Sequence, residues 1–181
     1  MKSYSAKDIR NIVLAGHGGR GKTTLAEAML FISNSTDRLG RVADGNTVMD
    51  FDAEEKRRKC SIASAIASLE WKNTKINIID TPGLFDFAAG MHEAVRAADT
   101  ALIVLSGKSG LNVGSEIAYD LAAENNIPRA FLVSKLDSPR AHFYKIMSML
   151  VGKYGSKICP VVVPSYEGEN LVGYVNLINK T

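Results

Sequence analysis

The chain has 181 residues, of which 46% are hydrophobic and 23% charged, and this length is enough for one domain with a sizeable core. The net charge of +3 permits an anionic partner but does not indicate one. The two cysteines, Cys60 and Cys159, lie far apart without metal-type neighbours, so we expect free thiols in a reducing cytoplasm. No apolar run approaches the roughly 20 residues of a membrane span, so no membrane association is expected.

Strands and helices are predicted to alternate along the chain. Apolar runs bounded by glycine or proline predict strands, and apolar residues spaced three or four apart predict helices. The expected strands are 11–16, 62–71, 75–80, 100–106, 129–135, 158–165 and 170–178. The expected helices are 23–32, 87–99, 112–126 and 138–155. Residues 33–61 are polar and weakly periodic, which predicts a long functional or mobile loop.

The last predicted helix carries the clearest local signals. Ser138 can cap it, Pro139 suits its first position, and Gly155 is placed to end it. One apolar face is assigned to the core; it consists of Phe143, Ile146, Met147, Leu150, Val151 and Tyr154. Because strands alternate with helices and several strands are apolar throughout, we expect an α/β fold with a mostly parallel sheet and helices on both faces.

The turn between the first strand and the first helix matches the pattern G-x-x-x-x-G-K-[ST] through Gly16, Gly21, Lys22 and Thr23. Glycines let successive backbone amides turn inward around a phosphate, and the helix N-terminus adds partial positive charge. Lys22 is expected to reach the terminal phosphates, and the Thr23 hydroxyl to ligate a Mg²⁺ ion that bridges phosphate oxygens. The sequence therefore predicts a nucleotide phosphate site here.

Two further segments bear on the metal and the base. In "NIIDTPG", Asp80 ends a predicted strand and is placed to act on Mg²⁺ through water; the alternative is a carboxylate that only caps a turn. In "VSKLD", Lys135 and Asp137 follow another strand. A carboxylate at Asp137 can accept two hydrogen bonds from a guanine edge, a donor pair that adenine lacks. The alternative is a solvated loop charge.

These segments, in this order, resemble a translational GTPase, most closely the first domain of elongation factor G. The resemblance covers nearly the whole chain through "GHGGRGKTTLAEAML", "TVMDFDAEEKRRKCSIASAIASLEW", "NIIDTPGLFDF" and "SKLD". It implies a Ras-like P-loop GTPase domain that binds GTP or GDP with Mg²⁺, with two switches that order around the γ-phosphate. The nucleotide contacts that it implies are Gly16, His17, Gly18, Gly19, Arg20, Gly21, Lys22, Thr23, Thr24, Asp80, Gly83, Ser134, Lys135 and Asp137, with Thr23, Ser61 and Asp80 as the Mg²⁺ set.

The chain departs from the family pattern at several positions, including Arg58-Lys59 in place of "RG". Ser61 stands where the family has the switch threonine, and it keeps the hydroxyl. The resemblance implies two catalytic positions, Lys22 and Leu84. Leu84 stands where the family has the histidine that orients the attacking water, and leucine has no polar atom for this task. We therefore expect slow hydrolysis with nucleotide binding retained. Ser134 replaces an asparagine, which lowers the expected guanine affinity. Gly19 replaces an aspartate and removes a possible ligand for a monovalent ion.

The C-terminal segment "CPVVVPSYEGENLVGYVNLI" resembles the family's entry into an inserted subdomain. We therefore expect a GTP-binding domain over 1–160, and a last core strand with the truncated start of the insert over 161–181. The expected partner is the ribosome through the full-length protein, and a monomeric, cytoplasmic state is expected. The charge run "EEKRRK" has two interpretations: a solvated surface, which is usual for a short run, and a contact with ribosomal RNA.

Three alternatives stay open on the sequence alone. The first is a GTP-binding switch module with little hydrolysis, which Leu84 favours. The second is a P-loop kinase or ATPase, which "SKLD" disfavours. The third lies within the family: ribosome-protection proteins and class-three release factors share these motifs.

Overall fold

The computed structural model describes residues 3–168 and 170–181, which divide into two compact units. The first unit comprises the described residues of Met1–Val104 together with Val113–Leu132. The second comprises Leu105–Asn112 and the described residues of Val133–Thr181. A search of the described helices finds none that is both long and apolar enough to cross a membrane.

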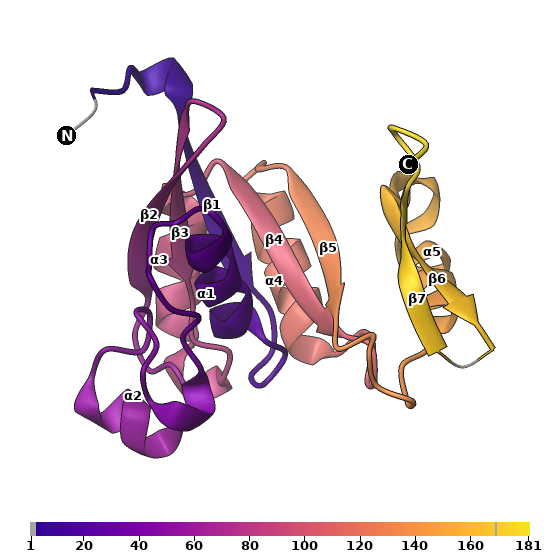
Figure 1. Ribbon diagram of the computed structural model, residues 1–181, viewed down its shortest axis with the longest axis horizontal. Coiled ribbons are helices and arrows are strands. Elements are labelled where there is room, and N and C mark those ends of the chain that lie inside the picture. The colour runs from indigo at the N-terminus through magenta and orange to yellow at the C-terminus, as the bar shows by residue number, and fades with distance from the viewer. Residues whose placement is uncertain (1–2, 169) are drawn as a thin grey trace. The chain divides into compact units, whose positions relative to one another are not determined.

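Strands and helices alternate through most of the chain (Figure 1). The strands are β1 (Ile9–Ala15), β2 (Ala65–Trp71), β3 (Thr74–Asp80), β4 (Thr100–Ser106), β5 (Arg129–Ser134), β6 (Val162–Glu167) and β7 (Asn170–Asn176). The α-helices are α1 (Lys22–Ile32), α2 (Ala53–Arg58), α3 (Ala88–Ala97), α4 (Val113–Glu124) and α5 (Phe143–Tyr154). Short 3₁₀ turns are η1 (Ala6–Asp8), η2 (Val42–Asp44), η3 (Phe85–Phe87) and η4 (Gly155–Lys157).

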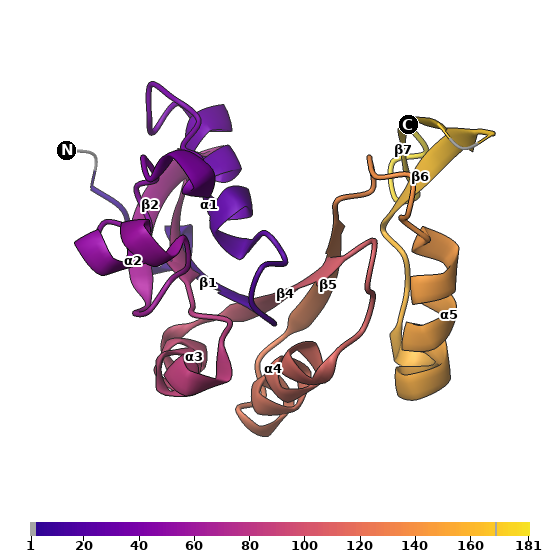
Figure 2. The same ribbon diagram turned by 90° about the horizontal axis from the view of Figure 1, so that it is seen from below.

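The main sheet has the strand order β2-β3-β1-β4-β5. Strand β1 is parallel to both β3 and β4, whereas β2 is antiparallel to β3. Figure 2 shows α1 on the face of the sheet opposite to α3 and α4. The expected α/β architecture with a mostly parallel sheet is therefore confirmed. Because Leu14 lies beside Asp80 in the parallel β1–β3 pair, the carboxyl ends of these strands share one edge.

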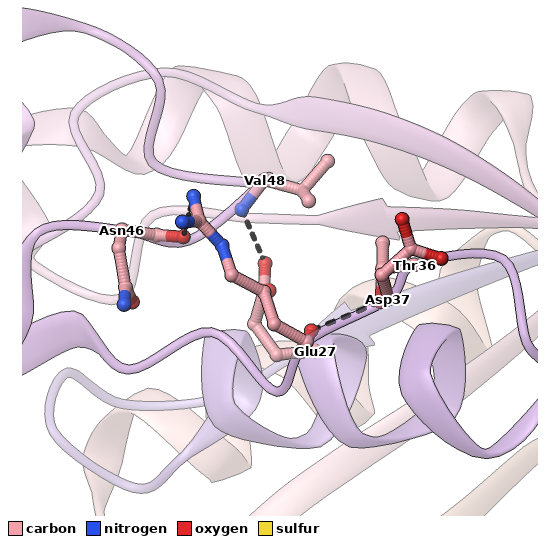
Figure 3. A pocket seen from close by; sticks show the side chains of 6 residues that line it. Glu27, Thr36, Asp37, Asn46 and Val48 are labelled. Carbon is pink, nitrogen blue, oxygen red and sulfur yellow. Dashed lines mark hydrogen bonds between the residues drawn. The ribbon is translucent and has the colours of Figure 1, made fainter.

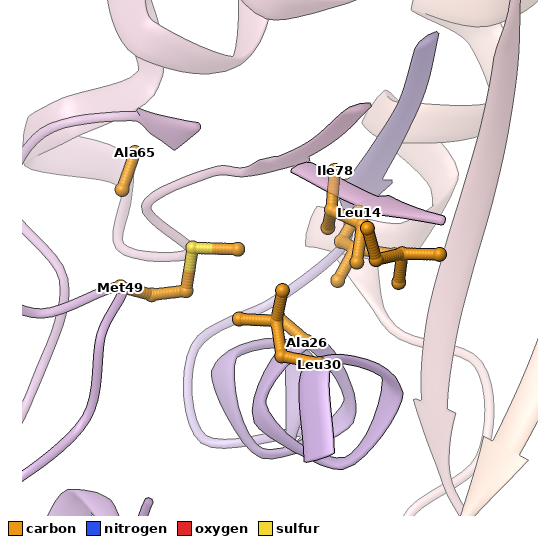
Figure 4. Close-up of a cluster of buried hydrophobic side chains, with 7 residues drawn as sticks. Leu14, Ala26, Leu30, Met49, Ala65 and Ile78 are labelled. Atoms are coloured by element: carbon orange, nitrogen blue, oxygen red, sulfur yellow. The ribbon is translucent and has the colours of Figure 1, made fainter. Parts of the chain in front are cut away.

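A buried apolar cluster joins helix α1 to the sheet (Figure 4). Its members come from β1, α1, β2, β3 and the segment before α2: Leu14, Ala26, Leu30, Met49, Ala65, Leu69 and Ile78. Met49 is 1% exposed, although it lies within the polar stretch that precedes α2. Burial of apolar side chains stabilises the fold by about 25 cal/mol per Å². Met49 therefore anchors part of that stretch beside α1.

The stretch 33–61 is not wholly irregular, because it contains helix α2. The side chain of Asp52 accepts a hydrogen bond from the Glu54 amide, and Glu55 accepts one from the Asp52 amide, which forms a capping box. The other oxygen of Glu55 accepts from the amides of Ile62 and Ala63, so one buried carboxylate joins the start of α2 to the chain that leaves it. The prediction of a loop was wrong here because the D-x-x-E signature was overlooked.

Helix α5 begins later than the sequence predicts. Ser138 lies in a turn, where its carbonyl accepts from the Ala141 amide, and the residue that precedes the helix is His142. The expected cap at Ser138 was therefore wrong, since turn chemistry competes with capping for the same serine. The C-terminal end is confirmed, because Gly155 follows the helix with φ 68°. Phe143, Ile146 and Leu150 of the predicted apolar face are buried.

Strand β6 pairs with β7 in a separate two-stranded antiparallel sheet. The prediction that 161–181 begins with a last strand of the core sheet stays a prediction. A bulge lies between Ser165 and Tyr166 of this hairpin. Local pairing across a short connection is favoured because it closes a small loop. The division of the chain at residue 160 stays a prediction.

Candidate functional site

The glycine-rich turn joins the end of β1 to the start of α1. Gly16, Gly19 and Gly21 all have positive φ, at 122°, 71° and 95°. A Cβ atom on Gly16 would lie 2.9 Å from the Val104 carbonyl oxygen of the neighbouring strand β4, so only glycine fits there without a backbone shift. The turn therefore has the backbone path of a phosphate loop. Thr24, the last predicted contact on this segment, is exposed in the first turn of α1.

Lys22 is buried at the first position of α1 and is only 5% exposed. Its Nζ donates to the carbonyl oxygens of Gly16 at 2.9 Å and His17 at 3.2 Å. Burial lowers the pKa of this ammonium group, and the charge of Asp80 opposes that effect. The ammonium thus lies inside the turn with its hydrogen bonds directed to the loop carbonyls.

A chain of hydrogen-bonded hydroxyls and a carboxylate lies below the turn. The hydroxyls of Thr23 and Ser61 are 3.2 Å apart, and Ser61 Oγ donates to Asp50 Oδ1 at 2.7 Å. The structure therefore brings Ser61 to Thr23, as predicted, although 38 residues separate them in the chain. It also brings in Asp50, which sequence reasoning missed. The available signal was the apolar Met49 beside it, which marks an anchored point in a polar stretch.

Asp80 is the last residue of β3; it lies near Thr23 and Lys22, and it is 1% exposed. Neither carboxylate oxygen has a well-formed hydrogen bond, and Asp50 Oδ2 is likewise buried without a partner. Burial raises the pKa of Asp80 to about 7, while the nearby Thr23 hydroxyl and the Lys22 charge oppose the shift. Burial also raises the pKa of Asp50. Buried oxygens of this kind are the donors that a hard cation such as Mg²⁺ prefers.

A metal ion beside Thr23 and Asp80 would need hydroxyl ligands as well as carboxylates. Within residues 3–168 and 170–181, no group of three or more His, Cys, Asp and Glu side chains gathers in a way that could hold a metal ion. Thr23 and Ser61 supply two hydroxyl oxygens, and Asp50 and Asp80 supply carboxylate oxygens without partners. These residues fit a Mg²⁺ ion that keeps several of its waters.

The loop after β3 lies directly on the phosphate loop. The Gly18 amide donates to the Gly83 carbonyl at 2.7 Å, and a Cβ on Gly83 would lie 2.5 Å from the Gly18 nitrogen. Leu84 is 39% exposed, and its Cδ2 would lie 3.0 Å from a Cβ on Gly18. The structure therefore places Gly83 and Leu84 beside the turn, and their roles toward a nucleotide stay predictions. It also shows that a backbone carbonyl takes one of the turn's amides.

His17 points toward the same loop. Its ring centroid lies 5.6 Å from that of Phe85 in a tilted arrangement, and its Cα, Cβ and Nδ1 atoms face Gly114 at the start of α4. Burial, followed by the charges of Arg20 and Lys22, lowers the pKa of His17. At neutral pH His17 is therefore a packing residue without charge between the turn and the loop after β3.

The predicted base-recognition residues belong to the second unit. Ser134 Oγ donates to the Leu105 carbonyl at 2.9 Å, so this serine fastens the end of β5 to the end of β4. Lys135 has φ 58°, in the left-handed region, and both Lys135 and Asp137 are exposed while Leu136 between them is buried. Their role toward a base stays a prediction.

The charge of Asp80 gives a testable pH dependence. A raised pKa means that the fold holds this proton after the unfolded chain has lost it, so the free energy of unfolding falls as pH rises from about 4 to about 7. In the nucleotide- and Mg²⁺-free protein, Asp80→Asn is expected to be more stable than wild type. That advantage should grow by about 2 to 3 kcal/mol between pH 5 and pH 8, measured by urea denaturation.

The matched control for this measurement is Asp120→Asn, at an exposed position on α4. We expect its stability to follow that of the wild type across the same pH range. An advantage of Asp80→Asn that is constant with pH would contradict the account, because the expected pH dependence comes from the ionisation of Asp80, which asparagine cannot undergo.

The fold and the turn together define a phosphate-binding α/β domain of the P-loop class. The family model described as "Elongation factor Tu GTP binding domain" matches residues 7–177. The chain therefore belongs to the family of elongation factor Tu-type GTP-binding domains. This assignment confirms the resemblance to the first domain of elongation factor G, and it disfavours the kinase or ATPase alternative.

Individual relatives agree with the family. The chain is 37% identical over 168 residues to an elongation factor G-like protein of Mycobacterium tuberculosis, covering 93% of this chain and 23% of that one. It is 37% identical over 177 residues to mitochondrial ribosome-releasing factor 2 of Anopheles gambiae, covering 98% and 24%. A crystal structure of a Thermus thermophilus protein has a TM-score of 0.90 and 35% identity, covering 94% and 26%. The chain thus spans about a quarter of the length of these relatives.

Proposed function

We propose that this chain binds GTP and GDP with Mg²⁺ and hydrolyses GTP slowly, as the GTP-binding domain of an elongation-factor-G-like protein that acts on the ribosome. The observation that carries the proposal is the polar cluster beside the phosphate loop, formed by the buried Thr23, Asp50 and Asp80 and the half-buried Ser61. Carboxylate oxygens buried without hydrogen-bond partners are uncommon in folded proteins, and a bound cation accounts for them. Asp80 stands at the carboxyl end of β3, beside the turn, and this is where phosphates bind in this class of fold.

Mg²⁺, when bound, neutralises charge on the phosphate oxygens. Thr23 and Ser61 would each supply a hydroxyl oxygen, while Asp50 and Asp80 would hold water molecules of its shell through their unpartnered oxygens. Lys22 would exchange its bonds to the loop carbonyls for bonds to phosphate oxygens, which are the stronger acceptors. Gly18 would release the Gly83 carbonyl, so that its amide becomes a donor for a phosphate.

Guanine selection is assigned to Asp137 in this proposal. Its exposed carboxylate is free of the core, and the left-handed backbone at Lys135 sets the turn that carries it. The Ser134 hydroxyl donates to the Leu105 carbonyl, so this serine fixes the end of β5, which precedes Lys135 and Asp137. Support for guanine comes from the family, whose model describes GTP-binding domains.

Slow hydrolysis is proposed because Leu84 has no polar atom with which to orient a water molecule. Its side chain instead covers Gly18 of the phosphate loop. Leu84→His is expected to raise the single-turnover rate of GTP hydrolysis by about 100-fold or more, since a side chain positioned for general acid–base catalysis typically contributes about 10²- to 10⁴-fold. The measurement is release of phosphate after mixing excess protein with GTP and Mg²⁺.

Leu84→Ala serves as the control, because it removes the leucine without adding a polar group. We expect its hydrolysis rate to stay at the wild-type level. A Leu84→His rate equal to that of the wild type, in a variant that still binds GTP, would show that the leucine does not limit hydrolysis.

A second candidate function is a GTP-binding switch module with little hydrolysis, and Leu84 is again the observation that favours it. Hydrolysis by the full-length protein with and without ribosomes separates the two. The two relatives named above have different names: one is an elongation factor G-like protein, and the other is a ribosome-releasing factor. A contact of helix α2 with ribosomal RNA belongs to the same proposal, although Arg57 and Arg58 both already pair with Glu54.

A further inference from the structure

Glu27 is a fully buried carboxylate on α1 that the proposed mechanism does not use. Its Oε1 accepts a hydrogen bond from the backbone amide of Val48 at 2.7 Å (Figure 3) and a second from the amide of Met49 at 3.1 Å. The acceptor and these donors are 21 and 22 residues apart in the chain. A side chain of the first helix therefore holds the backbone of the segment that leads into α2.

The second oxygen of Glu27 is enclosed by the same segment from its other side. Glu27 Oε2 is buried without a hydrogen-bond partner, and it lies against the Cα of Gly40. A Cβ on Gly40 would overlap this oxygen and would also lie 2.9 Å from the Cα of Thr47. Residues 40 and 47–49 thus enclose the carboxylate between them.

The turn that Glu27 holds leads directly to the proposed Mg²⁺ residues. Thr47 Oγ1 accepts from the Asp50 amide at 3.2 Å, and Asp50 in turn accepts from Ser61, which contacts Thr23. Met49, whose amide is one of the two that Glu27 holds, directly precedes Asp50, and its side chain is buried in the core cluster. One continuous set of contacts therefore joins Glu27 to Asp50 and Ser61.

Other residues of the segment between α1 and α2 line a cavity. A cavity of about 400 Å³ is lined by Glu27, Thr36, Asp37, Arg38, Asn46 and Val48 (Figure 3). Near it, the Arg38 guanidinium donates to the Asn46 carbonyl at 3.4 Å within the segment itself. The segment thus combines an open part over the cavity with a closely held part at Val48 and Met49.

We propose that Glu27 is a positioning residue that fastens the turn 47–50 to helix α1 and so brings Asp50 and Ser61 to Thr23. This inference rests on the proposed function for the role of those three residues, but the fastening itself does not. The hydrogen bonds to Val48 and Met49 carry the effect, so a neutral acceptor of the same shape preserves it. Loss of the acceptor frees the turn while the core of the sheet stays folded.

Hydrogen exchange in the nucleotide-free chain tests the fastening. In Glu27→Ala, exchange in residues 47–61 is expected to accelerate by at least about 10-fold, while β1, β3 and β4 keep their protection. Glu27→Gln keeps an acceptor oxygen and retains the wild-type pattern. Val95→Ala, a buried change on α3, provides the pattern of general destabilisation. Unchanged exchange at 47–61, or the same loss in the Gln and Ala variants, would overturn the proposal.

The link to the metal has its own readout. Dissociation of fluorescent GDP is measured with saturating Mg²⁺ and with EDTA. Mg²⁺ is expected to slow dissociation, and the ratio of the rate in EDTA to the rate in Mg²⁺ measures this effect. In Glu27→Ala this ratio falls by at least about 10-fold, while the rate in EDTA stays within about 2-fold of wild type. Glu27→Gln keeps the wild-type ratio. Equal acceleration in both conditions would overturn the positioning role. Failure of the wild type to bind GDP would refute the proposed function, and the exchange experiment would still decide the fastening.

Discussion

Replacing Lys22 with alanine is expected to weaken GDP binding by at least about 100-fold. The ammonium group is buried inside the turn, where it donates hydrogen bonds to the carbonyl oxygens of Gly16 and His17. Removal of the lysine leaves phosphate oxygens facing an apolar side chain in a buried site, where an unmatched charge is expensive. The affinity is measured by titration with a fluorescent GDP analogue in the presence of Mg²⁺.

Two measurements accompany this variant. Lys145→Ala removes an exposed positive charge from α5 and should bind GDP as the wild type does. Thermal unfolding shows whether Lys22→Ala stays folded, since the lysine also bonds the loop in the free protein. Folded Lys22→Ala protein with wild-type affinity would mean that the turn does not hold a phosphate.

The second large effect concerns the base. Asp137→Asn is expected to lower GDP affinity by about 100-fold and to raise affinity for xanthosine diphosphate. An aspartate accepts from the two donors on the guanine edge, whereas the asparagine amide places a donor opposite one of them. Xanthine has an oxygen where guanine has its amino group, so that donor regains a partner. Competition of both nucleotides against fluorescent GDP gives the ratio.

Asp120→Asn again supplies the control, with the same chemical change at an exposed position on α4. Its preference for GDP over xanthosine diphosphate should equal that of the wild type. If Asp137→Asn keeps the wild-type preference, Asp137 is a solvated loop charge and another group selects the base.

The parts of the fold that the sequence predicted are those with local signals. The apolar strand β1, the glycine turn and helix α1 are adjacent in the chain, and their pattern is complete within residues 9–32. Strand β4 was predicted with its observed bounds, Thr100–Ser106, because the run is apolar and buried. Family motifs then gave Ser61, since the resemblance covers that segment.

The parts that were missed depend on contacts between distant residues or on competing local chemistry. Glu27 looks like an ordinary helix glutamate, and only the folded chain brings Val48 and Met49 to it. Asp50 likewise gains its place through Ser61. Ser138 has the sequence of a cap but lies in a turn. Pattern alone cannot rank these outcomes, because the tertiary contacts decide between them.

The most direct test of the central claim is titration of a fluorescent GDP analogue into the chain with Mg²⁺, followed by competition with GDP, GTP and ATP. The expected result is saturable binding that GDP and GTP reverse and ATP does not. That result would place a guanine nucleotide at the glycine turn despite Ser134. Displacement by ATP as effective as by GTP, or no binding at high micromolar concentration, would contradict the account.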